Sequence, residues 1–174
     1  MKQKRLFLLS GPAGCGKSTW AKSQVEKNGG IWISRDVIRF SMLQEGEDYF
    51  SHEEEVFDLF LRTIQNEINN PIATNIYVDA THLNRAARDK VLRRLNLDLL
   101  DETICVFFNI DAETAIERNE PRTGQAHVPR SVIRRMALSH VMPSADEKFD
   151  YIIIIDKEGN EVIINDFLNI GFTF

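Results

Sequence analysis

The chain has 174 residues and a formal net charge of −5 at pH 7, and 43% of its residues are hydrophobic. We expect a single domain, residues 1–174, because a chain of this length can bury about 70% of its unfolded surface around one core. The acidic balance argues against a protein that coats nucleic acid non-specifically, since such binding needs a surplus of Lys and Arg, but it does not exclude contact with one strand end.

Cysteine usage and hydropathy favour a cytoplasmic protein. The two cysteines, Cys15 and Cys105, form no Cys-x-x-Cys pair and suit a reducing compartment. The apolar run Leu6–Leu9 is much shorter than the apolar core of an export signal, and the longest aliphatic stretch, Ile152–Ile155, is far too short to span a membrane. We therefore expect a cytoplasmic location and no membrane partner.

The first predicted strand, about Leu6–Ser10, leads into a segment with the spacing of a phosphate-binding loop: Gly11, Pro12, Ala13, Gly14, Cys15, Gly16, Lys17, Ser18 and Thr19. Between a strand and a helix, the unpaired amides of such a loop converge on an anion, and the helix dipole favours negative charge there. Lys17 can reach the β- and γ-phosphates of a nucleotide, and the Ser18 hydroxyl can ligate magnesium. Because a simple glycine-rich turn does not explain Lys17 and Ser18, we expect residues 11–19 to bind ATP with Mg²⁺.

Downstream of this loop, apolar β-branched runs alternate with longer helical patterns. Further strands are expected at Ile31–Ile33, Asn75–Val78, Ile104–Phe108, Tyr151–Asp156 and Glu161–Ile164, the last two joined by a tight turn. Helices are expected at Lys17–Lys27, from a Ser51–Glu54 capping box to about Ile68, and at Arg85–Leu97, Ala112–Asn119 (capped by Asp111) and Arg130–Val141. The alternation predicts an α/β fold with a doubly wound, mainly parallel sheet and helices on both faces.

The chain also contains two runs of charged residues and one polar segment. The basic run Arg85–Arg94 and the acidic stretch Glu45–Glu55 are interpreted as solvated faces. Residues 120–129 are polar and bracketed by prolines, which is typical of a mobile loop over a binding site. We therefore predict a helical lid at about residues 118–135, referred to below as the lid segment.

An aspartate follows each of two predicted strands. Asp36 follows the second strand, and Asp79 follows the third. Since ligands of open α/β sheets sit outside the carboxyl ends of the strands, both carboxylates should face the same cleft as the phosphate loop. Asp79 can orient magnesium together with Ser18, and Asp36 can accept the proton of an attacking hydroxyl. The alternative for both aspartates is a helix cap.

The remaining motifs narrow the class of phosphate-loop protein. No Asn-Lys-x-Asp is present, as a switch GTPase would need for guanine, and a motor ATPase usually needs a longer chain. A small P-loop kinase remains, with a loop for the donor, a carboxylate for the acceptor and lid arginines that close over the transferred group. Arg118 and Arg122, about one helical turn apart, are the candidate lid arginines.

In order and spacing, the segment from about Phe7 to Val141 resembles the kinase domain of phage-type and bacterial polynucleotide 5′-hydroxyl kinases. The resemblance rests on the phosphate loop, Ser34-Arg35-Asp36-Val37-Ile38-Arg39, Asp79-Ala80-Thr81-His82-Leu83-Asn84, and Arg118-Asn119-Glu120-Pro121-Arg122 with Val128-Pro129 beyond. It implies an ATP-dependent kinase for the 5′-hydroxyl of a DNA or RNA end. It also implies that Asp36 is the general base, that Arg39 holds the acceptor's 3′-phosphate or the phosphate in flight, and that Arg118 and Arg122 clamp the donor. Lys17, Asp36, Arg39 and Arg122 would then be catalytic, and Ser18 and Asp79 would hold the metal.

Two alternatives stay open at this point. The phage enzyme continues into a phosphatase domain, which has no room after Asp156, and the acidic stretch Glu45–Glu55 is awkward beside a polyanion. A kinase of the same fold acting on a nucleoside, sugar or antibiotic hydroxyl is therefore the leading rival. The second alternative is a non-catalytic ATP-binding module that signals through lid closure.

Overall fold

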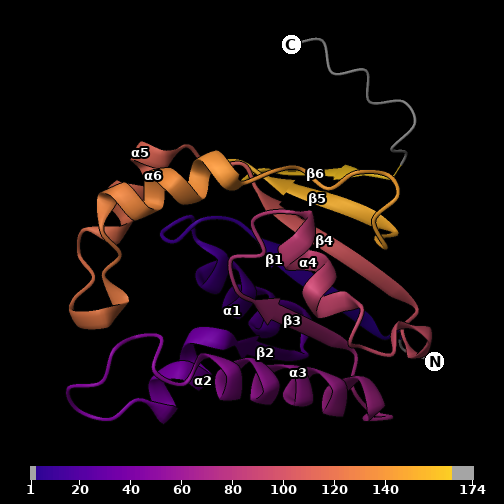
Figure 1. Ribbon diagram of the computed structural model, residues 1–174. Helices are drawn as coiled ribbons and strands as arrows, with labels where there is room; N and C mark the ends of the chain where they lie inside the picture. Colours follow the sequence, from indigo (N-terminus) through magenta and orange to yellow (C-terminus); the bar gives the residue numbers. More distant parts are fainter. Residues whose placement is uncertain (1–2, 166–174) are drawn as a thin grey trace.

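The computed structural model describes residues 3–165, so both ends of the predicted domain, residues 1–2 and 166–174, lie outside the described residues. A six-stranded sheet with the order β2-β3-β1-β4-β5-β6 runs through the molecule (Figure 1). Strands β1 to β5 are parallel and β6 is antiparallel to β5, as the predicted terminal hairpin requires. The strands are β1 Arg5–Ser10, β2 Ile31–Ser34, β3 Asn75–Asp79, β4 Glu102–Phe108, β5 Tyr151–Ile155 and β6 Glu161–Ile164.

Helices cover both faces of the sheet, which confirms the predicted doubly wound α/β class. Alternate residues of β1 point to opposite faces, so Leu6 and Leu8 join one buried core while Phe7 and Leu9 join the other. The first core includes residues of α3 and α4, and the second includes residues of α1, α5 and α6. The helices are α1 Lys17–Asn28, α2 Arg35–Met42, α3 Glu53–Asn69, α4 Arg85–Leu92, α5 Ala112–Asn119 and α6 Arg130–Ser139, with short 3₁₀ turns η1 Leu97–Leu99 and η2 Gly124–Ala126.

Three helix boundaries differ from the sequence prediction, one because of a local turn and two because of how the chain packs beyond the helix end. The Ser51–Glu54 capping box is wrong: His52 precedes α3, and the Ser51 amide donates to Asp48 O in a preceding turn. Helix α4 ends at Leu92 rather than Leu97, because the chain turns there and buries Leu95 in the core. Helix α6 ends at Ser139, because His140 stacks on Phe107 (ring centroids 4.0 Å apart) and Val141 N donates to Leu83 O.

The prediction of a solvated basic face is wrong for Arg88. Its side chain is fully buried and makes two bonds to Glu147, from Nε to Oε2 at 2.7 Å and from Nη2 to Oε1 at 2.8 Å. A third bond runs from Arg88 Nη1 to Val141 O at 2.9 Å. Burial alone would raise the pKa of Glu147, but the bonds from Arg88 and from the Ser144 amide lower it more, so the carboxylate stays charged. This pair joins α4 to the chain that leaves α6.

Two histidines behind the phosphate loop make stability depend on pH. Burial lowers the pKa of His82 to about 4 and that of His140 to about 4. Unfolded imidazoles bind protons near pH 6.5, so the unfolded state binds more protons between pH 6.5 and 4, and folding stability falls as the pH drops through that window. For His82 the loss is about 3 kcal/mol.

The variant His82→Asn tests this expectation. Asn tolerates the positive φ of residue 82 (39°) better than most residues, and it does not titrate. Urea denaturation at pH 7.5, 6 and 5 should show a shallower loss of unfolding free energy for the variant than for the wild-type protein. Equal slopes would mean that His82 does not contribute to the acid sensitivity, which would then come from His140 and the carboxylates.

Among residues 3–165, no helix combines the length and apolar character needed to cross a bilayer.

Candidate nucleotide and phosphoacceptor site

The phosphate loop connects β1 to α1 and requires glycine at two of its positions. Gly14 and Gly16 have φ values of 83° and 101°, a region that side chains disfavour. At Gly14 a Cβ atom would also lie 2.1 Å from Ala115 O of α5, so even a methyl group has no room. The glycines of the predicted loop thus allow a tight backbone curve packed against α5.

The backbone amides of this loop are free to bind an anion. Within the part of the chain that the structure describes, Cys15 N donates to Pro12 O and Trp20 N donates to Gly16 O. No backbone or side-chain acceptor within that part is bonded to the amides of residues 13, 14 and 16–19. Six amide donors at the positive end of α1 form an anion-binding cradle.

Lys17 adds its charge to the cradle. Its side chain is buried, and Nζ donates to Gly11 O at 2.9 Å and to Pro12 O at 2.8 Å. The ammonium group is therefore held inside the curve of the loop, where it can exchange these carbonyl partners for phosphate oxygens. Cys15 is buried beside it, with Sγ 3.6 Å from Nζ.

Ser18 and Asp79 meet at the mouth of the cradle. The Ser18 hydroxyl donates to Asp79 Oδ2 at 2.6 Å, and Trp32 Nε1 donates to the same oxygen at 2.9 Å. Asn84, not Asp79, caps the following helix α4, which removes the cap reading of Asp79. A hydroxyl and a carboxylate at this position suit magnesium, which prefers oxygen ligands and keeps several waters.

Asp36 lies in the first turn of α2, and it is not the helix cap. Ser34 fills that role, since its Oγ accepts a hydrogen bond from Val37 N. The Asp36 side chain is 60% exposed, and its Oδ1 accepts bonds from Arg39 Nη1 and from the Tyr49 hydroxyl, both at 2.6 Å. The two donors hold one carboxylate oxygen and leave Oδ2 for another partner.

A buried polar network fixes Arg39. Its side chain is only 5% exposed, and Nη2 donates to Glu53 Oε2 at 2.6 Å, while its guanidinium lies 4.2 Å from the centre of the Tyr49 ring. Glu53 also pairs with Arg35, whose pKa is lowered mainly by burial. Burial and the nearby Asp36 carboxylate raise the pKa of Tyr49, so its hydroxyl remains a donor. Glu53 is thus not a solvated acid of the Glu45–Glu55 stretch, because it holds two arginines.

One pocket of about 400 Å³ unites most of the predicted site. Its lining includes the following predicted residues: Ala13, Gly14, Gly16, Lys17, Ser18, Thr19, Asp36, Arg39, Asp79 and Arg122. Arg118 instead contacts the loop and the β5–β6 turn, through Nη1 to Cys15 O at 3.3 Å and Nη2 to Lys157 O at 2.7 Å. Of the two predicted lid arginines, Arg118 therefore lies against the phosphate loop and Arg122 lies in the pocket wall.

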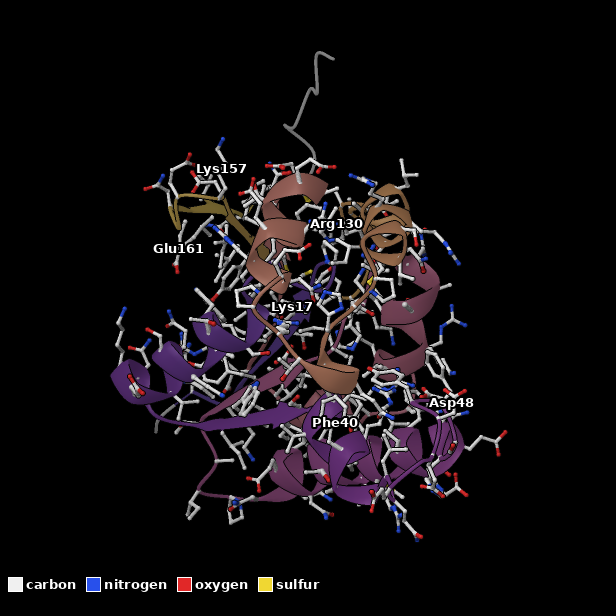
Figure 2. All side chains as sticks on the ribbon, turned by 90° about the vertical axis from the view of Figure 1, so that its left-hand side faces the viewer. Lys17, Phe40, Asp48, Arg130, Lys157 and Glu161 are labelled. Atoms are coloured by element: carbon white, nitrogen blue, oxygen red, sulfur yellow. The ribbon has the colours of Figure 1, made fainter. Side chains whose placement is uncertain are left out.

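The lid segment reaches across this pocket. Gln125 in η2 donates from Nε2 to Glu47 O in the α2–α3 loop at 2.9 Å. Figure 2 shows this part of the chain between the labelled Lys17 and Phe40, and Gln125, Ala126 and Val128 line the pocket from that side. The segment and the α2–α3 loop together form a bridge over the space beside Asp36.

The residues present fit a magnesium nucleotide. Six amides and one ammonium offer donors to phosphate, and Ser18 and Asp79 offer oxygen ligands. When bound, the metal would neutralise charge on the phosphate groups, whereas the loop and lid would orient them.

Several pocket residues were not singled out from sequence. Trp32 could be read only as a strand residue, and Glu53 only as part of an acidic run, because their partners lie far away along the chain. Tyr49 and Phe50 did carry a signal, since a pair of aromatic residues inside an acidic loop has no core to join.

Comparison with known proteins identifies the family. A family model described as an AAA domain (AAA_33) matches residues 6–143, which is most of the chain. The chain belongs to this family. Among curated proteins, this AAA domain is 25% identical to cytidylate kinase of Bacillus subtilis (strain 168) over 162 residues, which cover 90% of the chain and 68% of that enzyme.

Solved structures with the same fold include a chain of an RNA repair complex and a gluconokinase. A chain of the Pnkp1/Rnl/Hen1 RNA repair complex superposes with a TM-score of 0.68 and 20% identity over 80% of this chain, which spans only 44% of that larger chain. A gluconokinase from Sinorhizobium meliloti 1021 gives a TM-score of 0.58 at 18% identity, covering 90% of this chain and 84% of its own. These likenesses show that the AAA domain has the P-loop kinase fold.

Proposed function

We propose that this AAA domain is an ATP- and magnesium-dependent kinase that transfers the γ-phosphate to the 5′-hydroxyl of a DNA or RNA end. The observation that carries the proposal is the pairing, across a single pocket, of an anion cradle with the Asp36 carboxylate, whose Oδ2 has no hydrogen-bond partner among residues 3–165. Support for the acceptor comes from the resemblance of the Asp36–Arg39 and Arg118–Arg122 motifs to polynucleotide kinases and from the fold of the repair-complex chain.

In this proposal Asp36 Oδ2 accepts the proton of the acceptor hydroxyl while the hydroxyl oxygen attacks the γ-phosphorus; the bond from the γ-phosphorus to the β–γ bridging oxygen breaks, and ADP leaves. Lys17 and the loop amides hold the non-bridging phosphate oxygens, and Arg122, exposed at the pocket wall, donates to the transferred group. Ser18 and Asp79 would hold the metal, and movement of the lid segment would admit substrate. Arg118, in contact with the loop at Cys15 O, supports the donor side.

Arg39 is assigned to positioning. Its guanidinium already bonds Asp36, Tyr49 and Glu53. Because its side chain is only 5% exposed, little of the guanidinium is open to an acceptor phosphate, so we propose that Arg39 mainly fixes Asp36 for proton transfer. The two free, buried thiols, Cys15 and Cys105, support the cytoplasmic location expected from sequence.

A small hydroxyl-bearing acceptor is the second candidate. The acidic α2–α3 loop borders the acceptor side of the pocket, and its charge opposes the approach of a long polyanion. A kinase for a nucleoside or sugar would meet less repulsion there.

Transfer of label from [γ-³²P]ATP tests the proposal. The wild-type protein is offered a 5′-hydroxyl oligodeoxynucleotide, the matching oligoribonucleotide, nucleosides and gluconate, each with magnesium and with excess EDTA. We expect magnesium-dependent labelling of at least one oligonucleotide, and none of a 5′-phosphorylated control. Labelling of small acceptors alone would replace the polynucleotide proposal with the second candidate.

A further inference from the structure

Three aromatic side chains form one wall of the pocket next to Asp36. Phe40 lies near the end of α2, and Tyr49 and Phe50 lie in the α2–α3 loop; all three line the pocket. Tyr49 meets Phe40 edge to face (centroids 6.1 Å apart) and Phe50 in the same manner (4.8 Å). The three rings therefore make one continuous surface.

The outer rings of this wall remain open to solvent. Phe40 is 40% exposed and Phe50 is 66% exposed, and Val37, 53% exposed, extends the apolar surface along α2. Tyr49 differs, because its hydroxyl is bonded to Asp36 and its ring lies on Arg39. Tyr49 thus anchors the wall to the carboxylate, while Phe40 and Phe50 offer ring faces to a ligand. Exposed rings beside a polar pocket are typical of a stacking surface.

The position of the wall assigns it to the acceptor rather than the donor. A donor held by the cradle presents its terminal phosphate toward Asp36, so its base must lie at the opposite end of the triphosphate chain. Phe40 follows Asp36 by four residues in α2, which places both side chains on the same helix face. A ring stacked on this wall therefore belongs to the molecule whose hydroxyl meets Asp36.

We propose that Phe40 and Phe50 stack the base of the nucleotide that carries the attacking hydroxyl. This inference rests on the proposed kinase function and specifies its acceptor as one that bears a planar ring next to the hydroxyl. An acyclic polyol such as gluconate needs polar partners for its hydroxyl groups, and Val37, Phe40 and Phe50 supply none. The wall selects the end nucleotide by its base, whichever base that is, because every base has a stacking face.

Paired oligonucleotides test the stacking wall. One carries a normal 5′-terminal nucleotide, and the other carries an abasic 5′-terminal residue with the same 5′-hydroxyl. We expect the wild-type protein to show a KM about 10-fold lower for the normal end, with a similar kcat. Phe50→Ala should raise the KM for the normal end to nearly that for the abasic end, whereas Phe50→Tyr, which keeps a ring, should retain the preference. Phe40→Leu should behave like Phe50→Ala.

Controls separate the possible failures. Ile72→Ala removes an apolar side chain outside the pocket that is more exposed (85%) than Phe50 and should leave both KM values unchanged. Equal wild-type KM values for the two oligonucleotides, or a raised KM for ATP in Phe50→Ala, would overturn the stacking wall. Either result would leave the proposed kinase activity on 5′-hydroxyl ends intact. Absence of transfer to either oligonucleotide would overturn the proposed function itself.

Discussion

Asp36→Asn is expected to lower kcat by about 10²- to 10⁴-fold while leaving ATP binding intact, because an amide cannot accept the proton of the attacking hydroxyl. The substitution is close to isosteric. The Asn side-chain oxygen can still accept the bonds that Oδ1 now receives from Arg39 and Tyr49, so the network around α2 should persist. The measurement is single-turnover transfer to the acceptor identified above, together with the Kd for ATP.

A matched variant guards against a general effect of charge removal. Asp58→Asn removes one exposed carboxylate of α3 that is not part of the pocket lining. It should show wild-type kcat and wild-type ATP affinity. Unchanged kcat in Asp36→Asn would remove this residue as the base, and a parallel loss of ATP affinity would mean that Asp36 serves the fold instead.

Arg88→Leu is expected to reduce the free energy of unfolding by about 3–5 kcal/mol, the usual loss when one member of a buried ion pair is removed. Glu147 would be left buried, with Ser144 as its remaining partner in the present arrangement, and Val141 O would lose a donor. Urea denaturation near pH 7.5, where both groups are charged, measures the loss directly.

The double variant Arg88→Leu/Glu147→Leu separates pairing from packing. It should recover a large part of the lost stability, because no charge then remains buried at that site. Arg93→Leu, an exposed neighbour at the end of α4, should change stability by at most about 0.5 kcal/mol. A loss below about 1 kcal/mol in Arg88→Leu would contradict a structural role for the pair.

The fold was predictable from the chain because its signals are local. The phosphate loop can be recognised from the glycine spacing within residues 11–19 alone. The buried strands can be recognised as short runs of β-branched and aromatic residues. Where a helix ends was less predictable. The ends of α4 and α6 depend on burial of Leu95 and on the ring contact between His140 and Phe107, which no local pattern contains.

The candidate site shows the same difference between local and long-range signals. Lys17 and Ser18 could be proposed from the spacing of the phosphate loop, and Asp36 and Asp79 from their positions at or just after the carboxyl end of a strand. The partners that orient them could not. Tyr49 reaches Asp36 from a loop, and Glu53 reaches Arg39 from the first turn of another helix, so their role depends on how α2 and α3 pack. For the same reason the pairing of Arg88 with Glu147 could not be predicted, because the two residues are separated by 59 positions in the chain.

The close approach of Gly14 to Ala115 has a mechanical consequence. Because there is no space for even a methyl group between them, the phosphate loop packs rigidly against the middle of α5. Helix α5 continues directly into the segment that bears Arg122. Any swing of that chain must pivot beyond Asn119, which is buried and clasps Val128 through two hydrogen bonds. In the proposed opening and closing of the lid segment, its attachment point at Asn119 would therefore keep its position relative to the phosphate loop.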